Sequence, residues 1–294
     1  MNLKINCQGT GLVELTSKEG KLLRRGKVKD IYDIGDNRLL FVFSDRISAF
    51  DVILPSIVPN KGEILCKFSE FWFNILKIRN HMLKVKGKNK MVVKRLDMIP
   101  IECVVRGYVY GSLYDRLMKR EVRLDAKPEL ASKLPEPLLD PTTKSMEKDL
   151  PIAKGEILSK GLLKGEELSW IEERSVELYD DMAKRCERAG FIMADVKFEF
   201  GKDGDDILLA DSLGPDEFRL WPKEKYSVGK IQESYDKQLV RDWLINAGFK
   251  NDLDESVKKG SQLPKPPVLP DELIEETRRR YIVCFERITG LKFH

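Results

Sequence analysis

Histidine is nearly absent from this chain of 294 residues, which has only His81 and His294. A histidine-based catalytic triad or a histidine-rich metal cluster is therefore not expected. Cysteine is also scarce, and its five residues are widely scattered and mostly lie inside apolar segments: Cys7, Cys66, Cys103, Cys186 and Cys284. An odd, scattered set predicts reduced thiols in a cytoplasmic protein, and argues against a disulfide framework or a zinc site.

Long apolar runs and a strong charge imbalance are missing as well. No segment approaches the roughly 18 apolar residues of a membrane span, and the N-terminal MNLKIN lacks the pattern of a signal peptide. The net charge of +4 and the dispersed basic residues argue against a nucleic-acid partner. The content of 42% hydrophobic and 34% charged residues is typical of a soluble globular protein with one large core or two lobes.

The segment 191–221 combines the period of a strand with an unusual number of charges. Apolar and charged residues alternate over 195–200, which predicts a strand with one buried face. The other face then carries three charged side chains: Asp195, Lys197 and Glu199. A second apolar run over 207–210 ends in Asp211. A bound cation with phosphate would compensate charges gathered in this way, and a salt-bridged surface hairpin is the alternative.

The register of this hairpin decides whether its carboxylates are neighbours. A two-residue turn at Asp203-Gly204 would turn Asp211 to the wrong face. A loop centred on Gly204 pairs Asp211 with Lys197 instead, and makes Glu199 and Asp211 diagonal neighbours about 7–8 Å apart at Cβ. One metal ion can bridge that separation, so we predict the second register.

A basic segment lies before the turn of the first predicted hairpin, which covers 21–43 and turns at 35–37. Gly26 is followed there by Lys27 and Lys29. A glycine lets the backbone approach a phosphate, and alternate lysines on one strand face can neutralise its charge. Gly-Lys-x-Lys is not a Walker motif, so a solvated basic edge remains the alternative.

A second candidate phosphate site follows the segment 91–105, which predicts a strand, a hinge and another strand starting at Pro100. Arg106 comes next, and Ser112 stands at the glycine-marked start of a predicted helix over 113–120. A guanidinium, a hydroxyl and free backbone donors suit a phosphate, although Ser112 can also be simply an N-cap.

Two polar segments are predicted to be loops. The segment 44–62 is turn-rich and carries three polar candidates: Asp45, Ser48 and Asp51. Residues 124–151 are rich in proline and lack periodicity, which predicts a substrate loop or lid whose notable charges are Lys144 and Asp149. Loops commonly carry site residues, but all these charges can equally be solvated parts of plain connections.

Apolar periodicity predicts four further helices, over 64–76, 166–189, 231–247 and 272–289. Strands and helices do not alternate regularly, so an α+β fold is favoured over a doubly wound parallel sheet. We predict a β-rich, nucleotide-binding lobe over 1–98 and an α+β lobe over 99–294, with a nucleotide-sized cleft between them. The oligomeric state is left open.

Four segments resemble those of the SAICAR synthetase (phosphoribosylaminoimidazole-succinocarboxamide synthase) family: GKVKDIY at 26–32, IPIECVVRGYVYGS at 99–112, MADVKFEFG at 193–201 and ADSLGPDEFRLW at 210–221. SDRISAFD at 44–51, KGEILCKFSEFWF at 61–73 and PTTK at 141–144 support the resemblance. The chain departs from the family's usual residues at a few positions near the expected substrate: Tyr110, Ser212, Gly214, Glu217 and Phe218. It also lacks a histidine-bearing segment at 145–149.

The resemblance implies the family's two-lobed fold and an ATP-dependent ligase of purine biosynthesis. Such an enzyme joins the imidazole carboxylate of CAIR to the α-amine of L-aspartate and releases SAICAR, ADP and phosphate. A carboxylate is a poor electrophile, so ATP must first convert it into an acyl phosphate. Positioning and charge neutralisation by lysines and carboxylate-held Mg²⁺ would supply most of the catalysis.

The resemblance also implies roles for individual residues. An ATP site would be formed by Gly26, Lys27, Lys29, Lys94, Met98, Glu199 and Asp211. Glu199 and Asp211 would hold Mg²⁺, and Lys197, supported by Asp195, would steady the transferring phosphate. The 5′-phosphate of CAIR would be clamped by Arg106, Ser112 and Arg219. Weaker candidates for contacts with CAIR or aspartate are Asp45, Ser48, Asp51, Lys144 and Asp149.

Two alternatives belong to other functional classes. A small-molecule kinase would share the ATP and magnesium residues but would not require Arg106, Ser112 and Arg219. A non-catalytic nucleotide-binding protein would not need Lys197, Glu199 and Asp211 intact.

Overall fold

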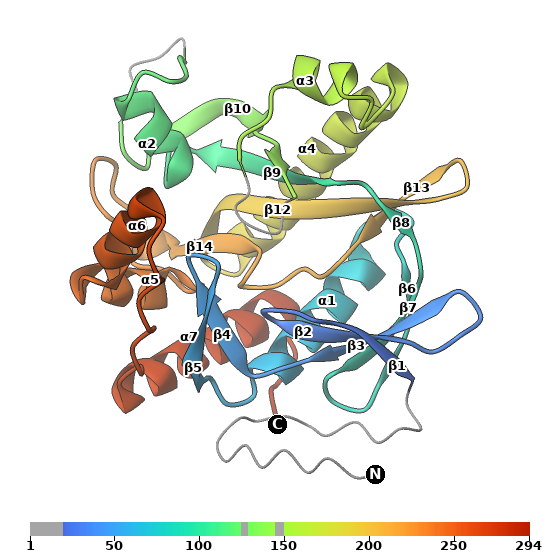
Figure 1. The fold of residues 1–294 in the computed structure, drawn as a ribbon, viewed down its shortest axis with the longest axis horizontal. Coiled ribbons are helices and arrows are strands. Elements are labelled where there is room, and N and C mark those ends of the chain that lie inside the picture. The colour runs from blue at the N-terminus through green and yellow to red at the C-terminus, as the bar shows by residue number, and fades with distance from the viewer. Residues whose placement is uncertain (1–19, 125–128, 145–149) are drawn as a thin grey trace.

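The computed structural model describes residues 20–124, 129–144 and 150–294, which form two large antiparallel sheets and one small two-stranded sheet, with helices packed around them (Figure 1). The first sheet has the strand order β1-β2-β3-β7-β6. Its strands are β1 Lys21–Arg25, β2 Lys29–Asp33, β3 Arg38–Phe43, β6 Met82–Lys86 and β7 Lys90–Lys94. The predicted hairpin turn is confirmed, since Asp36 and Asn37 between β2 and β3 have φ of 50° and 55°, as a tight hairpin turn requires.

The second sheet is built around β12, the longest strand among the described residues. Its main path has the order β10-β9-β12-β13, while β8 and β14 also pair with β12 and β11 pairs with β9. The strands are β8 Asp97–Met98, β9 Ile101–Tyr108, β10 Lys133–Leu139, β11 Thr142–Thr143, β12 Phe191–Asp203, β13 Asp206–Ala210 and β14 Phe218–Pro222. The predicted strand, hinge and strand over 91–105 thus correspond to β7, β8 and β9, and β9 begins directly after Pro100.

The helices pack mainly on the sheets and on each other. They are α1 Lys61–Ile75, α2 Ser112–Met118, α3 Lys154–Ser159, α4 Gly165–Arg188, α5 Gln238–Asn246, α6 Phe249–Lys259 and α7 Asp271–Thr289, with a short 3-10 turn at Lys223–Lys225. Helix α4 packs on β9, β10 and β12, and α1 packs on β3, β6 and α7. Within the described part of the chain, no helix is both long and apolar enough to cross a membrane.

One hydrophobic core connects the two sheets. It includes Phe43 of the first sheet, Trp72 of α1, Phe198 of β12, Met182 of α4 and Tyr281 of α7. The first sheet ends at Lys94, and β8 already pairs with β12. The division into lobes at residue 98 stays a prediction, because the core runs across it.

Two predicted loops contain strands. In the segment 44–62, β4 Arg46–Ala49 and β5 Val52–Ile57 form a small separate sheet. In the segment 124–151, β10 pairs with β9 at Lys133 and again at Leu138, with a break in register between them. The two prolines of β10 fall inside that break, where the missing N–H groups cost no ladder hydrogen bond.

The predicted helix over 231–247 is wrong in its first half, since α5 begins only at Gln238. The residues before it are bonded to β14 instead. Tyr235 N–H donates to the Leu220 carbonyl at 2.9 Å, and Asp236 accepts from Leu220 N–H at 2.9 Å. Gly248, directly after the predicted helix, has φ of 81° and leads into the unpredicted helix α6.

A buried ion pair ties α1 to the loop before β14. The Lys61 ammonium lies 2.7 Å from Asp216 Oδ2, and the Tyr281 hydroxyl donates to Asp216 Oδ1 at 2.7 Å. The side chains of Lys61 and Asp216 are 0% and 1% exposed. Although burial raises the pKa of Asp216, the Lys61 ammonium and the other cations and donors hold it well below its usual value.

Asp216→Asn should therefore lower the free energy of unfolding by about 3 kcal/mol, because it leaves the buried Lys61 charge unpaired. Urea denaturation followed by circular dichroism would measure this, with Glu255→Gln as the control. Glu255 forms an exposed pair with Lys259 at 2.8 Å, so its loss should cost no more than about 0.5 kcal/mol. The Asp216 carboxylate contributes to the free energy of unfolding above its unfolded pKa of about 4, and this contribution is lost as the pH falls through its lower folded pKa. The difference in the free energy of unfolding between the wild type and Asp216→Asn should therefore become smaller in acid.

Candidate active site

The charged face of β12 is flanked by charged residues of its neighbours. Asp195 stands opposite Arg106 of β9 on one side and opposite Arg219 of β14 on the other. Opposite residues of antiparallel strands project from the same face, so these three side chains form a row across the sheet. Lys197 and Glu199 lie further along the same face of β12. The alternation predicted for 195–200 is confirmed by the buried Val196, Phe198 and Phe200.

The row at Asp195 is a cluster of arginines. Arg219 forms an ion pair with Asp195, and Arg106 Nη1 lies 3.6 Å from Asp195 Oδ2. Arg106 also donates to Ser112 Oγ at 2.9 Å. The structure thus brings together Arg106, Ser112 and Arg219, the three predicted phosphate ligands.

Two residues of this cluster were not predicted. Asp140 accepts from Arg106 Nε at 2.6 Å and also pairs with Arg116 of α2. Among the described residues, two carboxylates thus form ion pairs with three guanidinium groups. Although burial raises it, the pKa of Asp140 is held below its usual value by Arg116 and Arg106. The cluster keeps a positive excess that suits an anion.

Arg219 has donor capacity left for such an anion. Its Nε is buried and has no hydrogen-bond partner among the described residues. Gly111, with φ of 57°, allows the turn before α2 to come close, because a Cβ there would lie 3.1 Å from Arg219 Nη2. The guanidinium also lies over the Tyr110 ring, 5.1 Å from its centroid.

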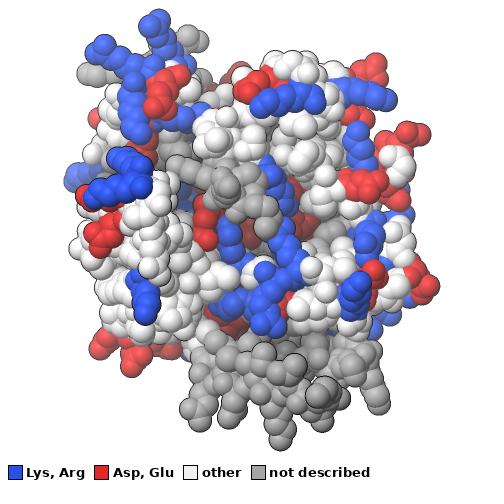
Figure 2. All heavy atoms as spheres, viewed as in Figure 1, with Lys and Arg blue, Asp and Glu red and all other residues white. Residues whose placement is uncertain are grey.

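The second cluster contains three lysines and three carboxylates. Lys197 Nζ lies 2.6 Å from Glu102 and 3.4 Å from Glu199, and Lys144 also pairs with Glu199. Although burial lowers it, the pKa of Lys197 is raised above its usual value by the carboxylates of Glu199 and Glu102, so its ammonium stays charged. Figure 2 shows Lys and Arg side chains gathered near the middle of one face of the molecule, with Asp and Glu side chains among them.

The first sheet contributes Lys29 to this second cluster. Its ammonium lies 2.8 Å from Asp211 Oδ1 and donates to Ser212 Oγ at 3.0 Å. Although burial raises it, the pKa of Asp211 is held well below its usual value by Lys29, Lys144 and Lys197. Lys144 and Lys197 therefore act on both Glu199 and Asp211.

The predicted register of the hairpin is wrong. The observed pairs are Glu199 with Ala210 and Asp203 with Asp206, so the turn consists of Gly204 and Asp205 alone. In this register Asp211 would face away from Glu199. The ladder ends at Ala210, however, and Asp211 has φ of 63°, so the alternation of strand faces no longer governs its side chain. The side chains of Glu199 and Asp211 therefore lie in the same cluster because Asp211 adopts a left-handed conformation.

His81 supports that left-handed residue and was not predicted to do so. Its Nε2 lies 3.1 Å from the Asp211 carbonyl oxygen, and its ring packs against the edges of Phe41 and Phe73. Burial lowers the pKa of His81 to about 4, so the ring is neutral at pH 7 and can donate its Nε2–H to the carbonyl. His81 is thus a positioning residue for Asp211.

The remaining predicted residues lie outside both clusters. Lys27 pairs with Asp51 at 2.5 Å in an exposed position, and Lys94 pairs with Asp203. Asp45 accepts from Gly62 N–H at 2.9 Å in the first turn of α1, and Ser48 is buried in β4. The segment with Met98 lies against Gly201, where a Cβ would come within 2.7 Å of Leu96. Asp149 lies outside the described residues, and the site roles of all these residues stay predictions.

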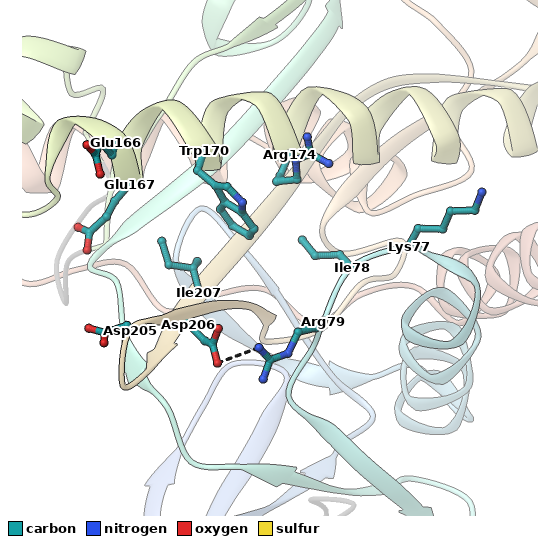
Figure 3. A pocket seen from close by; sticks show the side chains of 10 residues that line it. All are labelled: Lys77, Ile78, Arg79, Glu166, Glu167, Trp170, Arg174, Asp205, Asp206 and Ile207. Carbon is teal, nitrogen blue, oxygen red and sulfur yellow. Dashed lines mark ion pairs between the residues drawn. The ribbon is translucent and has the colours of Figure 1, made fainter.

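A pocket of about 470 Å³ lies beside the turn of the β12–β13 hairpin, where α4 begins (Figure 3). Trp170 of α4 faces Ile207 across it, and Arg79 pairs with Asp206 at 2.8 Å on its floor. None of its lining residues belongs to the two clusters. The pocket is lined by several cationic side chains and several carboxylates, so its charge favours neither anionic nor cationic ligands.

The model of the SAICAR synthetase family matches residues 22–259. The chain belongs to the SAICAR synthetase family. It is 50% identical over 272 residues to the phosphoribosylaminoimidazole-succinocarboxamide synthase of Nitrosopumilus maritimus (strain SCM1), covering 92% of this chain and 98% of that relative. The enzyme of the same name from Candida maltosa is 38% identical over 302 residues, covering 95% of this chain and 98% of that relative.

Solved structures of this family have the same fold. SAICAR synthase from Saccharomyces cerevisiae, in complex with SAICAR, superposes with a TM-score of 0.79 at 32% identity over 97% of this chain and 98% of that one. A SAICAR synthetase in complex with ADP has a TM-score of 0.70 at 29% identity over 92% of this chain and 99% of that one. The chain is thus an α+β ligase of purine biosynthesis that uses ATP to join CAIR and L-aspartate into SAICAR, releasing ADP and phosphate.

Proposed function

We propose that the two clusters divide this ligation between them, with the arginine cluster holding the 5′-phosphate of CAIR and the lysine cluster transferring the phosphoryl group. The supporting observation is their order on one face of β12, where Asp195 belongs to the first cluster and Lys197 and Glu199 to the second. Side chains two residues apart on a strand are about 7 Å apart, so one substrate can reach both clusters.

Lys29 and Lys197 would neutralise the phosphates of ATP, and the segment containing Lys94 and Met98 would face adenine through its backbone. Gly26 allows the tight turn before Lys29, because a Cβ there would lie 2.6 Å from the Lys29 carbonyl oxygen. That turn presents Lys27, which we propose to bind phosphate as well.

Mg²⁺ would be held by Glu199 and Asp211. No group of three or more His, Cys, Asp or Glu residues that could hold a metal occurs in the described part of the chain. Two carboxylates nevertheless fit Mg²⁺, which commonly keeps several waters and takes its remaining ligands from substrate phosphates. Bound there, the ion would neutralise charge on the phosphoryl group.

The reaction would proceed through an acyl phosphate. The carboxylate of CAIR attacks the γ-phosphorus of ATP, and the bond to ADP breaks while Lys197 stabilises the transferred group. The amine of aspartate then attacks the acyl carbon and phosphate leaves. Lys144, Asp45, Ser48, Asp51 and Asp149 remain proposed contacts to CAIR or aspartate.

We propose the cytoplasm as the place of action. The four cysteines in the described residues, Cys66, Cys103, Cys186 and Cys284, are buried and unpaired, which suits a reducing compartment.

The experiment is ADP release from ATP and Mg²⁺, with CAIR and aspartate each omitted in turn. We expect release only when both are present, together with one equivalent of SAICAR per ADP. Sustained release without aspartate would favour a kinase acting on the first substrate, and release without CAIR would contradict the proposed use of the arginine cluster.

A further inference from the structure

Glu217 is a carboxylate on the charged face that neither cluster uses. Val196 of β12 pairs with Phe218 of β14, and Lys197 N–H donates to the Glu217 carbonyl at 2.8 Å. Glu217 thus stands directly opposite Lys197, one row along from the pair of Asp195 and Arg219. Glu217 lies in the turn just before β14, where strand alternation does not set the direction of its side chain, but Lys29, Lys197 and Asp211 are close enough to act on the charge of its carboxylate.

The carboxylate of Glu217 differs from its neighbours in having no ion pair or side-chain hydrogen bond among the described residues. Lys197, directly opposite, is bound by Glu102 and Glu199 instead. Lys29 is bound by Asp211. Glu217 is partly exposed, so a ligand on this face can reach it.

The position of Glu217 suits a contact with the second substrate. The arginine row would hold one end of CAIR, and the phosphoryl group would be transferred in the row of Lys197 and Glu199. The acyl carbon would lie between them, and Glu217, two residues before Arg219 in the chain, lies beside Lys197 through its backbone bond. An amine that attacks the acyl carbon from this side would pass the Glu217 carboxylate.

We infer that Glu217 binds the α-ammonium group of the amino-acid substrate and accepts its proton. This inference rests on the proposed function of the two clusters. The ammonium loses one proton to the Glu217 carboxylate, and the neutral amine attacks the acyl carbon. The new C–N bond forms, the C–O bond to phosphate breaks with its electron pair, and the nitrogen's second proton goes to the leaving phosphate. The protonated Glu217 then releases its proton to water.

The electrostatics of the site support this role. Burial, followed by the nearby Asp216 carboxylate, raises the pKa of Glu217 to about 8. A base with a pKa near the working pH is well matched to proton transfer. The charged groups that act on it come from several elements around it: Lys29, Lys197, Asp211, Asp216 and Lys237.

The test compares Glu217→Gln with the wild type, using L-aspartate and then hydroxylamine as the acceptor. Hydroxylamine is uncharged at neutral pH and reacts with acyl phosphates without prior loss of a proton. We expect kcat/KM for aspartate to fall about tenfold or more, while hydroxamate formation and KM for ATP and CAIR change less than about twofold. In the wild type, kcat/KM for aspartate should level off above about pH 8, whereas in Glu217→Gln it should keep rising.

Glu217→Asp, which keeps the charge on a shorter side chain, should recover part of the loss. Glu224→Gln is the matched control, since Glu224 is exposed just beyond β14, and it should behave as the wild type. Equal losses with aspartate and hydroxylamine, or no loss with aspartate, would overturn the role of Glu217. Hydroxamate formation by the wild type in the absence of CAIR would instead overturn the proposed function, and this inference with it.

Discussion

Glu199→Gln should lower kcat by about a thousandfold or more while leaving the fold intact. The substitution removes one of the two carboxylates proposed to hold Mg²⁺, at a position that is 4% exposed and ion-paired with both Lys144 and Lys197. Loss of one strong electrostatic contact to a transferring group commonly costs ~10²–10³ in rate, and loss of metal binding adds to it. Steady-state kcat measured as a function of Mg²⁺ concentration is the readout, with circular dichroism as the check of folding.

Glu187→Gln is a matched control for this substitution. Glu187 pairs with Lys223 at 2.7 Å in an exposed position away from both clusters, so kcat should not change. Near-normal turnover of Glu199→Gln at saturating Mg²⁺ would contradict the metal assignment. The lysines around Glu199 would then act without an ion between the carboxylates.

Arg219→Ala should raise KM for CAIR about a hundredfold and KM for ATP less than about threefold. Its guanidinium offers a buried Nε without a partner among the described residues, and it can bind a phosphate through two parallel hydrogen bonds. Truncating one partner of a buried charge-assisted contact typically costs about 2–5 kcal/mol. Initial rates with one substrate varied and the others saturating separate the two effects.

Arg219→Lys tests the geometry of this contact in addition to its charge. A lysine keeps the positive charge but loses the planar fork, so KM for CAIR should recover only in part. Arg279→Ala, at an exposed pair with Glu276 on α7, is the control and should leave both constants unchanged. Equal increases in both constants for Arg219→Ala would mean that the phosphate clamp is misplaced.

The charged face of β12 could be predicted because apolar and charged residues alternate strictly over 195–200, a pattern that few structures other than a strand with one buried face explain. It did not predict the turn correctly, since Asp203, Gly204 and Asp205 all tolerate tight turns and each choice shifts the register by one residue. The left-handed conformation of Asp211 compensates for the shift, and the Asp211 carbonyl is contacted by His81, which is 130 residues away in sequence. Local periodicity carries no information about such a contact.

The other missed residues have similar explanations. Asp140 lies in a segment without periodicity, and only the pairing of β10 and β11 with β9 brings it to Arg106. Glu102 could have been found, because it interrupts the apolar run of a strand and a buried charge needs a partner. The first half of the helix predicted over 231–247 failed because tertiary bonds to β14 override local helix propensity.

The most direct test of the two-cluster arrangement is a crystal structure with Mn²⁺ in place of Mg²⁺, a non-hydrolysable ATP analogue and CAIR. Anomalous scattering locates Mn²⁺ without ambiguity. We expect the ion to be bound by carboxylate oxygens of both Glu199 and Asp211, with the 5′-phosphate of CAIR on Arg106 and Arg219. An ion bound away from Asp211, or a CAIR phosphate outside the arginine cluster, would contradict the arrangement.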